Sequence, residues 1–234
     1  MKKFIDKLYK GSKKDFFSIV EQNLKTEKKQ FIVTANPEAF MYGKRTESFK
    51  NLLLSNNTTV IADGIGIVKA AKKVDNLVYE RIPGVELAEH LFSLADKYNK
   101  SIYLFGAKPE VLEALCQKLE NEYKGLKIAG FCDGYKADKD KTFEEIKALS
   151  PDIILVALGI PAQEELIFKH LSGFEKGIFV GVGGSFDVLS GLKKRAPKIF
   201  IKCNLEWFYR IITEPKRIKR FYNNNVKFLL KVKK

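Results

Sequence analysis

Cysteine and histidine are scarce in this 234-residue chain, which has three cysteines and two histidines. Cys116, Cys132 and Cys203 form no C-x-x-C pair, so the sequence predicts neither a disulfide framework nor a zinc-binding cysteine cluster. His90 and His170 fall in separate expected helices, and neither has a second ligand at the spacing that zinc sites use. This cysteine usage is typical of a protein of the reducing cytosol.

Long apolar runs are also missing. No stretch approaches the roughly 18–20 residues that a helix needs to cross a bilayer, and the lysine-rich residues 1–17 contain no apolar core, so we expect no secretory signal. Hydrophobic residues still make up 45% of the chain and charged residues 30%, an ordinary globular balance that excludes wholesale disorder. The length suits one large domain, or a domain with an appendage.

Positive charge is concentrated at the C-terminal end. The formal net charge is +14, and residues 193–234 hold 14 Lys and Arg but only two acids, Glu206 and Glu214. Residues 1–192 hold the other 28 basic and 26 acidic residues and are nearly neutral. The sequence therefore predicts a body, 1–192, and a strongly basic appendage, 193–234, that could meet nucleic acid, an anionic membrane or a phosphorylated ligand.

The appendage is also rich in large apolar residues. Between Pro197 and Ile212 they are too dense for a solvated nucleic-acid arm, and after Pro215 cations alternate with apolar residues at helical spacing. This composition is typical of an interfacial helix at a membrane. It is equally typical of helices that pack on the body and leave a basic face in solvent, and periodicity does not separate the two interpretations.

Short apolar runs alternate with helix-like segments along the body. Strands are expected at 31–35, 58–63, 101–106, 126–135, 152–159 and 177–186, and one continuous helix is expected over 38–53. Continuous apolar strands separated by helices predict a parallel sheet covered on both faces, an α/β fold. Ligands of such sheets bind beyond the carboxyl ends of the strands.

Polar residues gather at these carboxyl ends. Asp63 ends a strand just before Gly64-Ile65-Gly66, where a short carboxylate is well placed to face a ligand. Helix capping is the alternative for Asp63 and for its counterparts after the first strand. The polar residues at strand ends are Thr34, Asn36, Asp63, Gln163 and Asp187.

Arg81 precedes Ile82-Pro83-Gly84 at the start of an expected helix. The helix dipole disfavours a cation at this position. We therefore expect the Arg81 guanidinium to face an anion or a carboxylate, with an ordinary surface arginine as the alternative.

Three further segments resemble known sites without completing a motif. Gly106-Ala107-Lys108-Pro109 leads into a helix N-terminus, which favours anions, but lacks the P-loop or G-x-G-x-x-G spacing. In 181–186 a phenylalanine stands at the third glycine position, so a nicotinamide-dependent oxidoreductase is disfavoured. Asp138-Lys139-Asp140 matches the D-x-D pattern of metal-using sugar transferases, but it lies in a lysine-rich stretch that follows no apolar strand, and we interpret it as a charged loop.

Seven segments together resemble one family, the WecG/TagA/CpsF glycosyltransferases, across nearly the entire chain. The last two segments are the most specific, because G-G-x-F-D, R-A-P and E-W-x-x-R are improbable together by chance. In chain order the segments are TANPEAF, ADGIGIV, RIPGVEL, LFGAKPEV, ALGIPAQEELI, GVGGSFDVLSGLKKRAP and NLEWFYRIITEPKRIKR.

The resemblance implies an α/β fold with a Rossmann-like parallel sheet, helices on both faces and a basic C-terminal helical appendage. It also implies inverting transfer of a sugar from a UDP-sugar, with no metal and no other cofactor. The implied acceptor is a polyprenyl-diphosphate-linked sugar at the cytoplasmic face of the cell membrane. The best-known members transfer N-acetylmannosamine, or its uronic acid, to lipid-linked N-acetylglucosamine during the synthesis of teichoic acid linkage units, common antigen or exopolysaccharide.

Residue roles follow from the same resemblance. Asp63 matches the proposed catalytic base, which takes the proton of the acceptor hydroxyl. Without a metal, fixed cations must stabilise the departing UDP diphosphate, and the matching appendage arginines are Arg210, Arg217 and Arg220. The candidate substrate-binding residues are Thr34, Asn36, Arg81 and Gln163, with Gly106, Lys108, Gly183 and Asp187 added from the loops described above.

The leading hypothesis is therefore a peripheral membrane transferase that uses UDP-N-acetylmannosamine and a lipid-linked N-acetylglucosamine acceptor. The appendage, 193–234, would complete the donor site and contact the membrane surface. A glucosyl- or uronosyl-transferase for another surface polymer is the alternative within the same class. A basic nucleic-acid-binding module is the alternative from a different class, and the apolar residues of the appendage disfavour nucleic acid as a partner. A homo-oligomer is compatible with the sequence.

Overall fold

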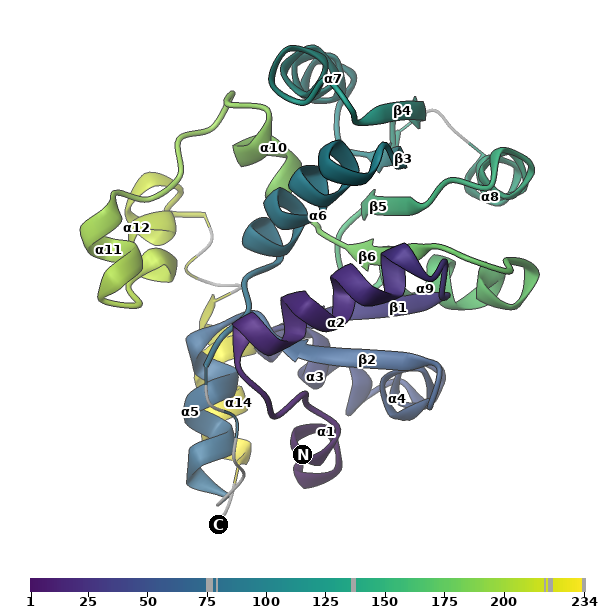
Figure 1. Cartoon of the computed structure of the whole chain (residues 1–234). Helices are drawn as coiled ribbons and strands as arrows, with labels where there is room; N and C mark the ends of the chain where they lie inside the picture. Colours follow the sequence, from purple (N-terminus) through teal and green to yellow (C-terminus); the bar gives the residue numbers. More distant parts are fainter. Residues whose placement is uncertain (75–77, 79, 136–137, 217, 219–220, 233–234) are drawn as a thin grey trace.

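Six parallel strands form one sheet at the centre of the molecule (Figure 1). The computed structural model describes the chain apart from residues 75–77, 79, 136–137, 217, 219–220 and 233–234. The strand order is β2-β1-β6-β5-β3-β4, and every pairing is parallel. The strands are β1 Gln30–Ala35, β2 Thr58–Ala62, β3 Ser101–Gly106, β4 Lys127–Cys132, β5 Ile153–Ala157 and β6 Ile178–Gly181. All six expected strands are present, and with them the α/β Rossmann-like fold, but the expected extent of the last one, 177–186, was wrong, because β6 ends at Gly181 and residues 185–186 begin a helix.

Helices cover both faces of the sheet and give the molecule three layers (Figure 1). One face carries α2 Lys13–Lys25, α6 Gly84–Tyr98, α7 Pro109–Glu122 and α10 Ser185–Leu189. The other face carries α1 Lys2–Asp6, α3 Pro37–Gly43, α4 Glu47–Leu54, α5 Ile65–Lys73, α8 Lys139–Leu149 and α9 Ala162–His170.

Side chains of each strand alternate between two hydrophobic clusters, one on each face. On β1, Phe31 and Val33 enter one cluster, and Ile32 enters the other. All three are at most 1% exposed. Each buried side chain of this size contributes about 1.5–3 kcal/mol relative to an exposed one. The period-2 alternation is therefore filled with apolar residues on both faces, and this explains why the strands form continuous apolar runs in the sequence.

The segment expected as one helix over 38–53 forms two helices, α3 and α4. A Cβ at Gly43 would lie 2.9 Å from Cδ1 of Leu53 and 3.3 Å from Cζ of Phe4. The missing side chain therefore lets the end of α3 contact α4, and the chain turns before Thr46, the N-cap of α4. The prediction of one helix was wrong because helical periodicity does not report this close approach.

A charged cluster ties the amino ends of the strands together, opposite the ends where ligands bind. Asp152, just before β5, accepts hydrogen bonds of 2.9 Å from both the N–H and the Oγ of Ser101. Its Oδ1 also lies 3.0 Å from Nζ of Lys176 and 3.3 Å from Nζ of Lys100. Although burial opposes the ionised form, these bonds and charges lower the pKa of Asp152 to about 2. This carboxylate has a structural role.

The C-terminal appendage is helical, as expected. It contains α11 Lys198–Lys202, α12 Glu206–Thr213, a π-helical segment Tyr222–Val226 and α14 Lys227–Lys231. α11 and α12 lie outside the three layers, near α6, whereas α14 returns to the body beside α5 (Figure 1). Phe228 of α14 is fully buried, with its ring centroid 6.1 Å from that of Phe40 in α3. No helix in the described parts of the chain is both long enough and apolar enough to span a membrane.

Candidate active site

Asp63 follows β2 directly, at the carboxyl edge of the sheet. Its main-chain N–H donates to the Ala35 carbonyl at 2.9 Å, which holds it beside the end of β1. Its Oδ1 accepts a hydrogen bond of 2.7 Å from the N–H of Gly84, the first residue of α6. The capping alternative thus holds in a modified form: Asp63 satisfies an N–H at the start of α6, and the N-cap of the helix that follows it is Gly64.

Burial raises the pKa of Asp63 above its ordinary value. The Gly84 N–H and the positive charges of Arg210 and Arg81 oppose this effect, and the negative charge of Glu206 adds to it. The net direction is upward, so the carboxylate binds a proton more strongly than an ordinary aspartate does. This is the property that a general base requires.

Three arginines surround one buried carboxylate near Asp63, and we call Glu206 with Arg81, Arg195 and Arg210 the arginine cluster. Oε2 of Glu206 lies 3.3 Å from Nη2 of Arg81. Its Oε1 lies 3.0 Å from Nη2 of Arg210 and 4.0 Å from Nε of Arg195. The expectation that Arg81 faces a carboxylate is confirmed. The cluster brings a body residue, Arg81, together with the appendage arginine Arg210.

Thr34 and Asn36 leave the neighbouring strand β1 and have different local roles. The buried Thr34 hydroxyl donates to the Gly181 carbonyl at 2.8 Å and joins the ends of β1 and β6. Asn36 Oδ1 accepts from the N–H groups of Glu38 and Ala39, at 2.9 and 3.1 Å, so the capping interpretation is right for Asn36. Both side chains lie at the same edge of the sheet as Asp63, and their roles in substrate binding stay a prediction.

Gln163 joins the loops that follow β5 and β6. Its Oε1 accepts hydrogen bonds of 3.0 Å from the N–H groups of both Gly159 and Gly183. Gly183 has φ +50°, a conformation that favours glycine, and this turn aims its N–H at the amide. The predicted residues Gln163 and Gly183 are thus in direct contact, and the buried amide holds two loops at the carboxyl edge.

Glu164 is a functional candidate that the sequence reasoning missed. It is fully buried, its Oε1 accepts from Nε2 of Gln163 at 2.7 Å, and its Oε2 has no hydrogen-bond partner in the described structure. Burial raises the pKa of Glu164 to about 8. A signal was present, because Glu164, Ile167 and Leu171 share the i, i+3, i+7 spacing of a buried helix face.

Other predicted residues lie farther from Asp63. Gly106 ends β3 and Lys108 follows it, and this strand is four inter-strand steps of about 4.8 Å, or roughly 19 Å, from β2. The Lys108 side chain is 62% exposed and its ammonium lies 3.8 Å from Glu110. Asp187, in α10, pairs with Lys193 at 3.2 Å. The structure therefore assembles Asp63, Arg81 and Arg210 in one region and leaves Lys108 at another part of the same edge.

Two predicted residues, Arg217 and Arg220, lie outside the described residues. Among the residues that are described, no three His, Cys, Asp or Glu side chains come together in a way that could hold a metal ion. Arg81 and Arg210 are the cations that the described structure places beside Asp63.

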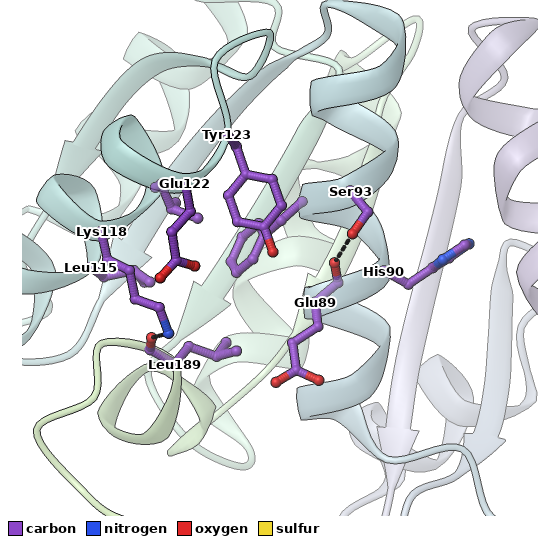
Figure 2. A pocket seen from close by; sticks show the side chains of 10 residues that line it. Glu89, His90, Ser93, Leu115, Lys118, Glu122, Tyr123 and Leu189 are labelled. Carbon is purple, nitrogen blue, oxygen red and sulfur yellow. Dashed lines mark hydrogen bonds between the residues drawn. The ribbon is translucent and has the colours of Figure 1, made fainter.

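A cavity of about 310 Å³ between α6, α7 and α10 is lined by none of the predicted site residues. In Figure 2, Glu122 and Tyr123, at the end of α7, face Glu89 and Ser93 of α6, and His90 points away from them. The His90 ring instead stacks on Phe17 with centroids 4.2 Å apart. Burial lowers the pKa of His90, so it behaves as a packed core histidine.

Known proteins resemble this chain over most of its length. The model of the family described as "Glycosyl transferase WecG/TagA/CpsF family" matches residues 5–234. The chain is 41% identical over 189 residues, 81% of this chain and 73% of the relative, to an N-acetylglucosaminyldiphosphoundecaprenol N-acetyl-beta-D-mannosaminyltransferase of Bacillus subtilis (strain 168). It is 39% identical over 205 residues, 87% of this chain and 80% of the relative, to the Staphylococcus aureus (strain NCTC 8325 / PS 47) protein of the same name.

Proposed function

Since the chain belongs to the WecG/TagA/CpsF family of glycosyltransferases, we propose that it transfers N-acetylmannosamine from UDP-N-acetylmannosamine to a polyprenyl-diphosphate-linked N-acetylglucosamine. The relatives that it resembles at 39–41% identity are named for this transfer. The observation that carries the proposal is the position of Asp63, a partly buried carboxylate with a raised pKa beside the guanidinium groups of Arg81 and Arg210.

Asp63 acts as the general base in this proposal. The acceptor hydroxyl loses its proton to the Asp63 carboxylate while its oxygen bonds to the anomeric carbon of the donor sugar. The bond from that carbon to the UDP oxygen breaks, and its electron pair leaves with UDP. Attack from the face opposite UDP inverts the anomeric configuration. A base whose pKa is raised accepts the proton more readily than an ordinary aspartate.

Arg81 and Arg210 stabilise the departing diphosphate. Negative charge on UDP grows as the bond breaks, and fixed guanidinium groups lower the energy of that transition state. Both guanidiniums are held on Glu206 in the donor-free structure, at 3.3 and 3.0 Å. With these cations, supplemented by Arg217 and Arg220, the transfer would proceed without a metal ion.

The appendage also supplies a surface suited to a membrane-linked acceptor. Ile199 is 68% exposed and Ile212 is 56% exposed, and Trp207 and Phe208 are each more than a third exposed. Lys198, Lys202 and Lys216 of the same segment are also exposed. A surface of this composition binds the interface of an anionic bilayer, so we extend the proposal to peripheral attachment at the membrane face where the acceptor lies.

The test is turnover by the purified full-length chain. With UDP-N-acetylmannosamine and a short-chain polyprenyl-diphosphate N-acetylglucosamine, we expect UDP release, a disaccharide-lipid product of inverted configuration by NMR, and the same rate in excess chelator. UDP-glucose and the corresponding N-acetylmannosaminuronic acid donor, offered separately, test the alternative within the class. If no UDP-sugar is turned over, the proposal fails. Salt-sensitive retention on DNA without any response to UDP would favour the nucleic-acid alternative.

A further inference from the structure

Glu206 is the buried acid of a segment that is otherwise strongly basic. Residues 193–234 contain two acids. Glu206 is 7% exposed, whereas the Glu214 side chain is 42% exposed and lies 3.6 Å from Lys193. A carboxylate loses its hydration when it is buried, and this cost is offset only if several donors or cations replace the water.

Those cations come from three separate parts of the chain. Arg81 lies between β2 and α6, Arg195 lies before α11, and Arg210 lies one turn after Glu206 in α12. Arg195 is in turn held by Glu86 of α6, with 2.8 Å between Nη2 and Oε1. Glu206 is therefore the carboxylate that links the appendage to the segment entering α6.

The segment that enters α6 also binds the predicted base, Asp63, by a hydrogen bond. Arg81 is three residues before Gly84, whose N–H binds Asp63. The side chain of Arg81 is only 16% exposed. Without the Glu206 carboxylate, this poorly hydrated guanidinium would lose its ion-pair partner, and Arg210, whose side chain is 48% exposed, would lose the pair that holds it beside Arg81, so neither would be fixed in its present position.

We propose that Glu206 is a positioning residue that docks α12 on the body and fixes the guanidinium groups of Arg81 and Arg210 beside Asp63. The inference rests on the proposed function for the roles of Asp63 and the arginines, and it adds a residue to which neither that function nor the sequence reasoning assigned a role. Glu206 acts through its neighbours and does not itself contact the reacting atoms.

Two consequences follow for the site. α12 has eight residues, and isolated helices shorter than about 12 residues are marginal in water, so α12 depends on its docking contacts. Asp63 faces three charged side chains: Arg210 and Arg81, which lower its pKa, and Glu206, which raises it, while burial makes the largest upward contribution. Loss of the Glu206 charge and entry of water would each lower the pKa of Asp63, whereas departure of Arg210 would raise it, so undocking of α12 changes this pKa through opposing effects.

The test compares Glu206→Gln with Glu206→Asp and with the matched control Glu214→Gln in the full chain. Hydrogen exchange of α12 and the emission of Trp207, the single tryptophan, report docking without any donor. We expect faster exchange of α12 and a red-shifted emission in Glu206→Gln, partial recovery in Glu206→Asp, and no change in Glu214→Gln.

Kinetics on the same variants test the positioning role. For Glu206→Gln we expect kcat/KM to fall at least about tenfold and its acid limb to move away from the wild-type position, because the charges and the water around Asp63 change. A merely structural role would lower the rate without moving the limb, and would overturn the positioning of Asp63 and the arginines.

Unchanged α12 exchange and unchanged turnover in Glu206→Gln would overturn the whole inference. Wild-type protein that turns over no UDP-sugar, while Glu206→Gln still loses its docking signals, would reject the proposed function and leave the docking role standing.

Discussion

The N–H of Gly84 donates a hydrogen bond of 2.7 Å to Oδ1 of Asp63, across 21 residues of sequence. This bond fixes the carboxylate at the junction of β2 and α6. A helix N-terminus stabilises negative charge, so Gly84 helps to keep Asp63 ionised at a partly buried position. The orientation of the candidate base is therefore set by main-chain geometry and does not depend on a flexible side chain.

Asp63→Asn should abolish most turnover while the fold is retained. The amide keeps an oxygen for the Gly84 N–H but cannot take a proton, and general-base catalysis contributes about 100–10,000-fold. UDP release measures the loss, and circular dichroism with UDP titration checks folding and donor binding. Asp138→Asn, at the exposed N-cap of α8, is the control and should keep full activity. Near-wild-type turnover in Asp63→Asn would reject Asp63 as the base.

The pH dependence of the wild-type enzyme should reflect the raised pKa of Asp63. The base must be ionised, and burial raises its pKa above the ordinary 3.8, so kcat/KM should decline at a higher pH than for an exposed aspartate. Profiles of kcat/KM measured toward acid, with folding monitored in parallel, give the midpoint. A profile that stays flat down to the ordinary aspartate range would contradict the electrostatics described here.

Glu164→Gln should stabilise the protein at neutral and alkaline pH. The pKa of Glu164 is about 8 in the folded protein and 4.5 in its ordinary state, so between these values the folded chain holds a proton that the unfolded chain has released. Wild-type stability therefore falls as the pH rises through that interval. Gln keeps the acceptor for Gln163 and cannot ionise, so its advantage should grow from about pH 5 to pH 8 in urea unfolding. Glu165→Gln, a partly exposed neighbour, should show no such trend.

Asp152→Asn should destabilise the fold at neutral pH by about 2 kcal/mol. The pKa of Asp152 is lowered from 3.8 to about 2 in the folded state, so its ionised form stabilises the protein above about pH 4 and this contribution disappears as the pH falls toward 2. Chemical unfolding of wild type and variant should converge over that acid interval. Glu47→Gln, in a pair whose glutamate is 72% exposed, should change stability by less than about 0.5 kcal/mol.

Phe228→Ala should lower the free energy of unfolding by about 3–5 kcal/mol, as expected for removal of a fully buried aromatic ring. Leu230→Ala is the matched control, because Leu230 is 71% exposed on the same helix. Urea unfolding followed by far-ultraviolet circular dichroism measures both variants. Equal stability of the two would show that α14 is not part of the folded core in solution.

Much of the fold could be predicted because its strands are apolar runs that end at Asn36-Pro37, at Gly64 or at other turn signals. Four helices of the body, α1, α2, α5 and α10, were not predicted. α2 is rich in lysine and its capping box pairs Ser12 with Asp15 rather than with Glu or Gln, and α5 begins at Gly64 without a side-chain cap. Strong tertiary packing, not local propensity, defines them.

The candidate site was predictable only in part. The unfavourable position of Arg81 at a helix start indicated a carboxylate partner, but the partner, Glu206, lies 125 residues away, and no local pattern connects them. Glu164 has the spacing of a buried helix face, yet its charge made an exposed position seem more natural. Contacts between distant segments, set by strand order and by the docking of α12, supplied what the sequence could not.

The appendage is attached to the body on both sides of α12, before it by the pair of Arg195 with Glu86 and after it by the fully buried Phe228. α12 is consequently tethered to the body on both sides. If α12 separates from Arg81, the tether keeps Arg210 close to the site. Redocking of α12 is then an intramolecular step at high effective concentration.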